Sequence, residues 1–162
     1  GVPCRIEHHG ASKHDLKWDR DLEEVDYATL LPACAEGIRE VQHPQAFIAR
    51  TAFQQLLEHE RAGAKAKPLL VPVTNGLRAA FSDKDKGVFP AALAALRQLS
   101  TAVGPALNPH LKGLLGQLAR KALDARLRDD VTATLQQLEE NGGPEAFAVI
   151  KSKVPTYTTV CL

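Results

Sequence analysis

Apolar side chains recur at helical spacing through most of the chain after residue 26, and no other feature restricts the possible folds as strongly. The clearest case is Leu111, Leu114, Leu115 and Leu118, which follow the i, i+3, i+4, i+7 pattern of one helix face. The composition agrees, because the 162 residues include 24 Ala and 22 Leu against 15 Val and Ile together. Unbranched side chains lose less rotamer freedom in a helix than β-branched ones. The sequence therefore predicts an all-α fold.

Proline and glycine divide this pattern into separate helices joined by short loops. Asn108 followed by Pro109 indicates a capped helix start, and Asn141-Gly142-Gly143 indicates a helix end. The charged segment 82–87 (SDKDKG) is expected to be a turn, and the segment 61–67 (RAGAKAK) a loop. The expected helices span approximately residues 27–40, 44–57, 68–81, 89–103, 108–122, 127–141 and 144–150.

The helices also recur in pairs. Leu69-Leu70 corresponds to Leu114-Leu115, 45 positions later, and the segments QQLLEH, AALRQL and LQQLEE lie about 40 positions apart. Repeats of about 40–47 residues, each made of two packed helices, are typical of HEAT and armadillo proteins. We therefore expect one armadillo/HEAT-like α-solenoid of paired antiparallel helices over residues 26–162. An ordinary helical bundle is the alternative.

Residues 1–25 differ from the rest because they are polar, rich in histidine and without helical period. We expect them to form an extended N-terminal arm, in which Leu16 and Trp18 make a short strand-like or docking segment. The chain begins at Gly1 without an initiator methionine, so we expect it to be a piece of a longer protein. Its length corresponds to one domain.

The charged and reactive residues exclude several functions. The 20 Lys and Arg nearly balance the 19 Asp and Glu, so the charge does not favour nucleic acid binding, and no apolar run is long enough to cross a membrane. Three widely spaced cysteines argue against a disulfide framework and favour a reducing compartment. The cluster Cys4, His8, His9 and His14 lacks the paired spacing of a zinc site. Because no nucleophile elbow or phosphate-binding loop occurs either, we expect no enzyme activity, cofactor or metal.

Basic residues cluster near the ends of the predicted helices. In a solenoid the equivalent turns stack along one edge, so these cations are expected to form a basic ridge that faces an acidic partner. The alternative is a solvated face on which neighbouring Asp and Glu balance them. The acidic pair Glu139-Glu140 is also expected to stay solvated at a helix edge. The ridge comprises Lys65, Lys67, Arg78, Lys84, Lys86, Lys112, Arg120, Lys121, Arg126 and Arg128. The last seven of these are the expected partner contacts.

Four segments spread over nearly the whole chain carry a resemblance to a known family. The segments are PCRIEHHGASKHDLKW, AEGIREVQHPQAFIARTAFQQLLE, LRQLSTAVGPALNPHLKGLL and LEENGGPEAFAVIKSKVPTY. They are similar to the Parkin co-regulated protein (PACRG) family, most closely to its PACRG-like branch. The C-terminal match is specific, and it adds Lys151, Lys153 and Tyr157 to the expected partner contacts. The shared C-terminal residues are Gly142, Gly143, Ile150, Lys151, Val154, Pro155, Thr156 and Tyr157.

The resemblance implies an armadillo/HEAT-like domain without catalytic activity, which serves as a structural element of the axoneme in cilia and flagella. PACRG itself belongs to the inner junction of doublet microtubules. The expected partners are therefore tubulin in microtubules and other axonemal proteins of a large cytoskeletal complex in the cytoplasm, with no nucleic acid and no membrane. The long N-terminal extension of PACRG is expected to be missing here, so the central apparatus, spoke bases and basal body stay open as locations. A soluble adaptor that binds a peptide or small protein in a concave groove is the alternative function.

Overall fold

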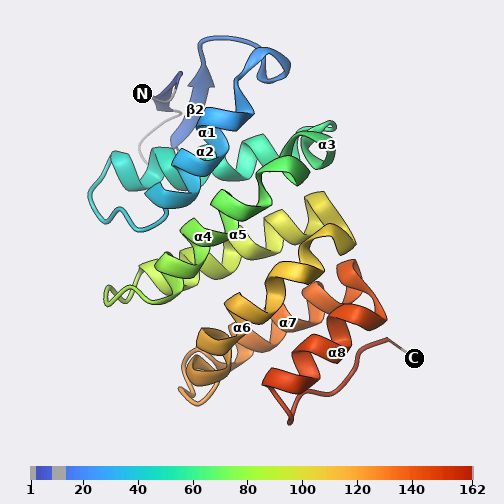
Figure 1. Ribbon diagram of the computed structural model, residues 1–162. Helices are drawn as coiled ribbons and strands as arrows, with labels where there is room; N and C mark the ends of the chain where they lie inside the picture. The colour runs from blue at the N-terminus through green and yellow to red at the C-terminus, as the bar shows by residue number, and fades with distance from the viewer. Residues whose placement is uncertain (1–2, 9–13, 162) are drawn as a thin grey trace.

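The described part of the chain is helical apart from a two-stranded sheet at its N-terminal end (Figure 1). A computed structural model describes residues 3–8 and 14–161. Short 3-10 turns, η1 (Leu22–Glu24), η2 (Lys67–Leu69) and η3 (Gly104–Leu107), join some elements. The strands and α-helices are β1 (Cys4–His8), β2 (His14–Trp18), α1 (Tyr27–Gly37), α2 (Gln45–Glu58), α3 (Ala62–Ala66), α4 (Leu70–Phe81), α5 (Val88–Val103), α6 (Asn108–Lys121), α7 (Arg128–Gly142) and α8 (Pro144–Lys153). The predicted all-α class is confirmed, with the small sheet as an addition.

The main helices are arranged in two rows (Figure 1). In the first row, α1 contacts α4, α4 contacts α6, and α6 contacts α8. In the second row, α2 contacts α5 and α5 contacts α7. Consecutive helices cross between the rows, because α1 packs on α2, α4 on α5, and α6 on α7. Each pair of helices therefore contacts the pair before it and the pair after it.

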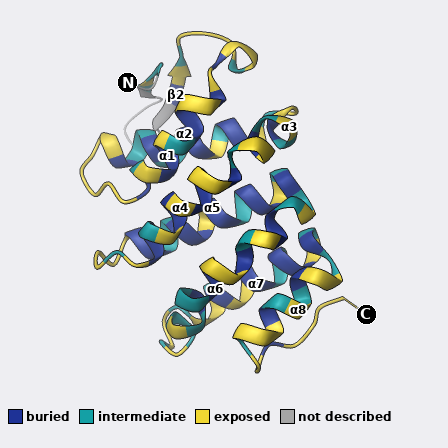
Figure 2. Ribbon diagram, viewed as in Figure 1, coloured by how far each residue is buried: buried dark blue, intermediate teal, exposed yellow. Residues whose placement is uncertain are grey.

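The hydrophobic core lies between the two rows, where the buried side of each helix faces its neighbours (Figure 2). All four leucines of the predicted 111–118 stripe are at most 1% exposed, which confirms the helix register inferred there. Phe53 of α2, Leu77 of α4 and Leu96 of α5 are completely buried. Full burial of a side chain of this size stabilises a protein by about 1.5–3 kcal/mol relative to its exposure.

Two sequence-based expectations about the helices are wrong, one on a segment between helices and one on the start of α6. Segment 61–67, expected to be a loop, contains the short helix α3, because Ala62 and Ala66 at i and i+4 are both buried against the core. Asn108 does not cap a helix; it is the first residue of α6, and the chain enters that helix from η3. Its buried side-chain Nδ2 instead donates a hydrogen bond to the carbonyl of Gly142, at 2.9 Å. Asn108 therefore connects α6 to the end of α7.

The chain reverses between α7 and α8 at two adjacent glycines. Gly142 is the last residue of α7 and is buried beside Asn108. Gly143 has φ +76° and ψ −160°, a conformation that L side chains rarely adopt. The predicted helix end at residues 141–143 is confirmed.

The N-terminal segment departs most from the sequence-based expectation. Residues 4–8 pair with residues 14–18 as an antiparallel sheet, in which Ile6 lies opposite Leu16. The strand-like character of Leu16 and Trp18 is confirmed, but these residues belong to a paired sheet that packs on α2, and not to an extended arm. Leu16 is buried in the core, and Trp18 Nε1 donates a hydrogen bond to Gln55 Oε1 at 2.6 Å. His9, together with the rest of residues 9–13, lies outside the described residues.

Candidate interaction surface

The ten residues expected to contact a partner do not form one continuous ridge. The structure places them in three groups: a cleft between two turns, the outward face of α6, and the region around the end of α8. The groups are, in that order, Lys84, Lys86, Lys121 and Arg126; then Lys112 and Arg120; then Arg128, Lys151, Lys153 and Tyr157.

The α4–α5 turn and the α6–α7 turn line one cleft, which we call the turn cleft. It has a volume of about 340 Å³, and Phe89 and Leu127 supply its apolar surface. Lys84 and Lys86 enter it from the first turn, whereas Lys121 and Arg126 enter from the second. Lys121 Nζ lies 5.6 Å from the centre of the Phe89 ring, a favourable cation–π distance. Equivalent turns of successive helix pairs thus meet at the same edge of the molecule.

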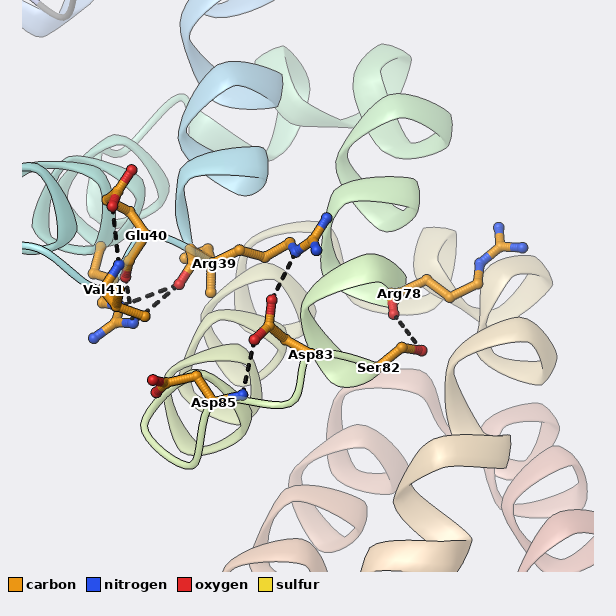
Figure 3. Close-up of polar contacts among 9 residues, drawn as sticks. Arg39, Glu40, Val41, Arg78, Ser82, Asp83 and Asp85 are labelled. Carbon is orange, nitrogen blue, oxygen red and sulfur yellow. Dashed lines mark hydrogen bonds and ion pairs between the residues drawn. The ribbon is translucent and has the colours of Figure 1, made fainter.

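Acidic side chains lie among the cations of the turn cleft, namely Asp83, Asp85 and Asp124. Asp83 accepts a hydrogen bond from the backbone N–H of Asp85, at 2.9 Å, and another from Arg39 Nε, at 3.0 Å (Figure 3). Those bonds, the backbone one first, hold the pKa of Asp83 below its usual value. Asp124 is paired with Arg126, whose side-chain hydrogen bond is the main cause of the lowered pKa of that carboxyl. The three aspartates offset most of the charge of the four cations, as on the solvated face that the sequence left open as an alternative.

The outward face of α6 has a different charge pattern. Lys112 and Arg120 are both exposed, and neither side chain forms an ion pair or a hydrogen bond with another residue that the structure describes. The sequence of α6, residues 108–121, contains no Asp or Glu. On the neighbouring helix α4, Arg78 is exposed and donates a hydrogen bond to Asn75 Oδ1 at 2.7 Å. These cations can therefore meet an external anion without first breaking an internal ion pair.

Tyr157 lies inside the fold, so it is removed from the expected partner contacts. Its side chain is 5% exposed, and its ring centre lies 6.2 Å from that of Phe147. Burial raises the pKa of its hydroxyl to about 12. Lys151 is exposed, but its Nζ donates a hydrogen bond to the Tyr157 carbonyl at 2.8 Å, which ties the segment after α8 back to that helix. Aromatic packing and this hydrogen bond both hold Tyr157 in place.

Glu139 is a further departure from the sequence-based expectation, because it is buried and not solvated. It is 1% exposed, and its Oε2 accepts hydrogen bonds from Thr159 Oγ1, at 3.0 Å, and from the Val160 N–H, at 3.1 Å. Burial raises the pKa of Glu139, but hydrogen bonding with Thr159, Val160 and Cys161 together outweighs burial and leaves the pKa lowered. The signal that could have shown this is its position four residues after Leu135, on the apolar side of α7.

The described residues were also compared with the requirements of a metal site, a reactive cysteine and a membrane span. No group of three or more His, Cys, Asp or Glu within the described ranges is placed to hold a metal ion. Burial is the main cause that raises the pKa of Cys34 to about 12, which favours its unreactive thiol form. None of the described helices combines the length and apolar character that a membrane span requires.

The fold and this surface define a class: a mostly helical protein, whose described part presents charged turns and clefts. The family model described as Parkin co-regulated protein matches residues 1–159 of the chain. The chain therefore belongs to the Parkin co-regulated protein family, which confirms the resemblance found in its sequence.

A curated relative from mouse supports the same assignment. The Parkin coregulated gene protein homolog of Mus musculus is 28% identical to this chain over 178 aligned positions. The alignment covers 99% of the chain and 73% of the mouse protein. The similarity thus extends through the small sheet and both rows of helices.

Proposed function

We propose that this chain is a non-enzymatic structural protein of the axoneme in cilia and flagella, where it associates with microtubules and with neighbouring axonemal proteins. Membership of the Parkin co-regulated protein family supports this proposal, because the resemblance implies an inner-junction-like role. The proposed location is the cytoskeleton of the cytoplasm, within a large complex.

The arrangement of the helices supports a role in assembly. We propose that the stacked pairs form an armadillo/HEAT-like unit, in which each pair contacts only its neighbours. A unit of this kind has long edges and two broad faces, so several partners can bind it at the same time. A stable contact of this type is expected to bury more than about 1,000 Å² in total.

The observation that carries the microtubule contact is the unbalanced charge of α6. Lys112 and Arg120 are exposed and unpaired among the described residues, and the helix that holds them has no acid. Tubulin surfaces are acidic, so this face is complementary to them. At physiological salt, charges beyond about 8 Å are screened, and the cations would act only at direct contact.

Co-sedimentation with stabilised microtubules tests this contact. The double charge reversal Lys112→Glu/Arg120→Glu is expected to lower the bound fraction several-fold at low ionic strength. The matched control reverses Lys17 and Arg20, which are also exposed but lie near the sheet, and should bind like the wild type. Equal loss in both variants would show that only net charge matters. Wild-type binding by the α6 variant would exclude this face.

Fractionation of cilia separates the axonemal role from the alternative of a soluble adaptor. A structural protein of the axoneme should stay with the doublet microtubules after extraction with detergent and mild salt. Release of the chain into the soluble fraction would contradict the structural proposal and favour an adaptor that binds a peptide or a small protein.

A further inference from the structure

A second cleft lies where the end of α6, the start of α7 and the segment after α8 meet, and we call it the tail cleft. In Figure 1 the α6–α7 turn and the end of α8 lie at the bottom of the view, and both contribute to this cleft. Its volume is about 570 Å³, larger than that of the turn cleft. The residues that line it are Ala119, Ala122, Leu123, Arg128, Thr132, Leu135, Gln136, Lys153, Val154, Pro155, Thr156, Tyr157 and Thr158.

The charge of the tail cleft is unbalanced. Arg128 and Lys153 are both exposed, and none of the described residues that line the cleft is acidic. Arg128 Nε donates a hydrogen bond to the Ala122 carbonyl at 3.3 Å, which fixes the guanidinium while leaving its terminal amino groups free of described partners. The turn cleft, in contrast, carries three aspartates among four cations. The tail cleft therefore has the larger excess of positive charge, and none of its cations is balanced by an acid in the lining.

The tail cleft also exposes apolar surface. Leu123 is 83% exposed, and the partly buried Val154 lies with it in the lining. A leucine side chain in this position loses about 1.5–3 kcal/mol of stabilisation relative to full burial. An aliphatic side chain of a partner would remove this surface from water.

Backbone groups at the rim of the tail cleft are available for pairing. Thr156 and Thr158 belong to the irregular segment after α8 and make no hydrogen bond with any residue in the described ranges. This segment is nevertheless held in place on both sides, by Lys151 at the Tyr157 carbonyl and by Glu139 at the Val160 N–H. A fixed segment with unpaired donors and acceptors can bind an extended peptide through main-chain hydrogen bonds.

We propose that the tail cleft binds an extended acidic peptide segment of a partner protein. Carboxylates of the peptide pair with Arg128 and Lys153, an aliphatic side chain packs on Leu123, and the peptide backbone bonds to Thr156 and Thr158. The inference does not depend on microtubule binding, because none of these residues lies in the α6 face assigned to that contact.

Fluorescence anisotropy with synthetic peptides tests the proposal. The probe is a labelled peptide in which glutamates flank a central leucine, and the control probe has glutamine at each glutamate. The acidic probe is expected to bind at least tenfold more tightly than the neutral probe, because about 1.4 kcal/mol corresponds to a tenfold change and a charge-assisted pair can supply that much. Equal binding of the two probes would overturn the proposal.

Variants of the chain locate the site. Arg128→Gln/Lys153→Gln is expected to weaken binding of the acidic probe about tenfold, and Leu123→Ser about threefold. The matched control, Lys84→Gln/Lys86→Gln in the turn cleft, should bind like the wild type. Circular dichroism melting verifies that each variant is folded. If the turn-cleft variant loses binding and the tail-cleft variant does not, the assignment is wrong.

A second copy of this chain is the other candidate for binding in the tail cleft. If Leu123 serves to bind a peptide, analytical ultracentrifugation should show the same monomeric species for the wild type and for Leu123→Ser. A wild-type dimer that Leu123→Ser dissociates would show that a second copy covers the cleft, and would overturn the proposal.

Discussion

The two rows of helices are held together by different kinds of contact. In the second row, polar side chains connect α5 and α7: Arg97 of α5 donates to Thr134 Oγ1 and Asp130 of α7, and Gln137 of α7 donates to Thr101 of α5 at 2.8 Å. In the first row, no side-chain hydrogen bond among the described residues joins α4 to α6 or α6 to α8, and close apolar packing holds these helices. On α6 of the first row, the side chains of Lys112 and Arg120 have no partner among the described residues.

This difference indicates how the protein divides its charges. Polar side chains that hold the second row together are occupied and not available to a partner. Apolar packing in the first row requires no surface charge, so the exposed cations of α6 can serve binding alone. The following four changes test this division, in order of decreasing effect on stability.

Leu115→Asp is expected to have the largest effect, because it places an unpaired charge at a position of α6 that is 0% exposed. The loss should exceed about 4 kcal/mol and prevent folding. Urea unfolding followed by circular dichroism measures it. Leu123→Asp, at the 83% exposed leucine that follows the same helix, is the control and should fold normally. A stable Leu115→Asp protein would show that the register of α6 is wrong.

Gly76→Val tests the close packing of α4 on α1. A Cβ at Gly76 would lie 3.0 Å from Ala35 Cβ and 3.1 Å from backbone atoms of Ala35 and Glu36. The valine should therefore force the helices apart and lower the free energy of unfolding by about 2–3 kcal/mol. Thermal unfolding compares it with Gly116→Val, whose Cβ has no neighbour within 4 Å and which should stay within about 0.5 kcal/mol of the wild type. Equal losses would mean that helix propensity, not contact, decides.

Arg97→Met tests the polar connection in the second row. It removes the donors to Thr134 and Asp130, and we expect a loss of about 1–2 kcal/mol in the free energy of unfolding. Arg126→Met is the control, because Arg126 is 77% exposed and its ion pair lies within one turn, so denaturant midpoints should hardly change. If Arg97→Met were also neutral, the second row would depend on apolar contacts like the first.

Lys112→Gln/Arg120→Gln should have the smallest effect on stability. Neither side chain has a described partner, so the free energy of unfolding should change by less than about 0.5 kcal/mol, as measured by urea titration. A clear gain in stability would show that the two cations repel each other or Arg78 in the folded protein. A clear loss would show that they hold the first row together.

The sequence predicts the helices far better than it predicts the polar contacts. Apolar spacing placed Leu111 and Leu115 on a buried face, since burial of helical side chains has a fixed period. The pairing of residues 4–8 with residues 14–18 could not be found, because the polar, histidine-rich segment gives little alternation. The sequence did not predict α3, because Gly63 disfavours a helix there. In the fold, burial of Ala62 and Ala66 stabilises this helix despite the glycine.

The sequence predicted individual residues of the candidate surface, but it did not predict how the fold groups them. Spacing placed Lys84 and Arg126 in equivalent turns, which do meet in the turn cleft. It could not show that Asp83 and Asp124 balance them, since the path of each side chain depends on its hydrogen bonds. Burial of Tyr157 depends on the return of the chain after α8, a long-range contact that no local pattern reports.

The adjacent glycines at the end of α7 have a consequence for handedness. Gly142 excludes any L side chain by space, because a Cβ there would lie 2.4 Å from Asn108 Oδ1. Gly143 has no atom within 4 Å of such a Cβ, and only its φ of +76° excludes an L residue. The mirror image of its torsions falls in the polyproline II region, so a D-alanine introduced at Gly143 by chemical synthesis would adopt its own preferred conformation. Lack of space therefore closes the first position of this turn to an L side chain, whereas backbone conformation alone closes the second.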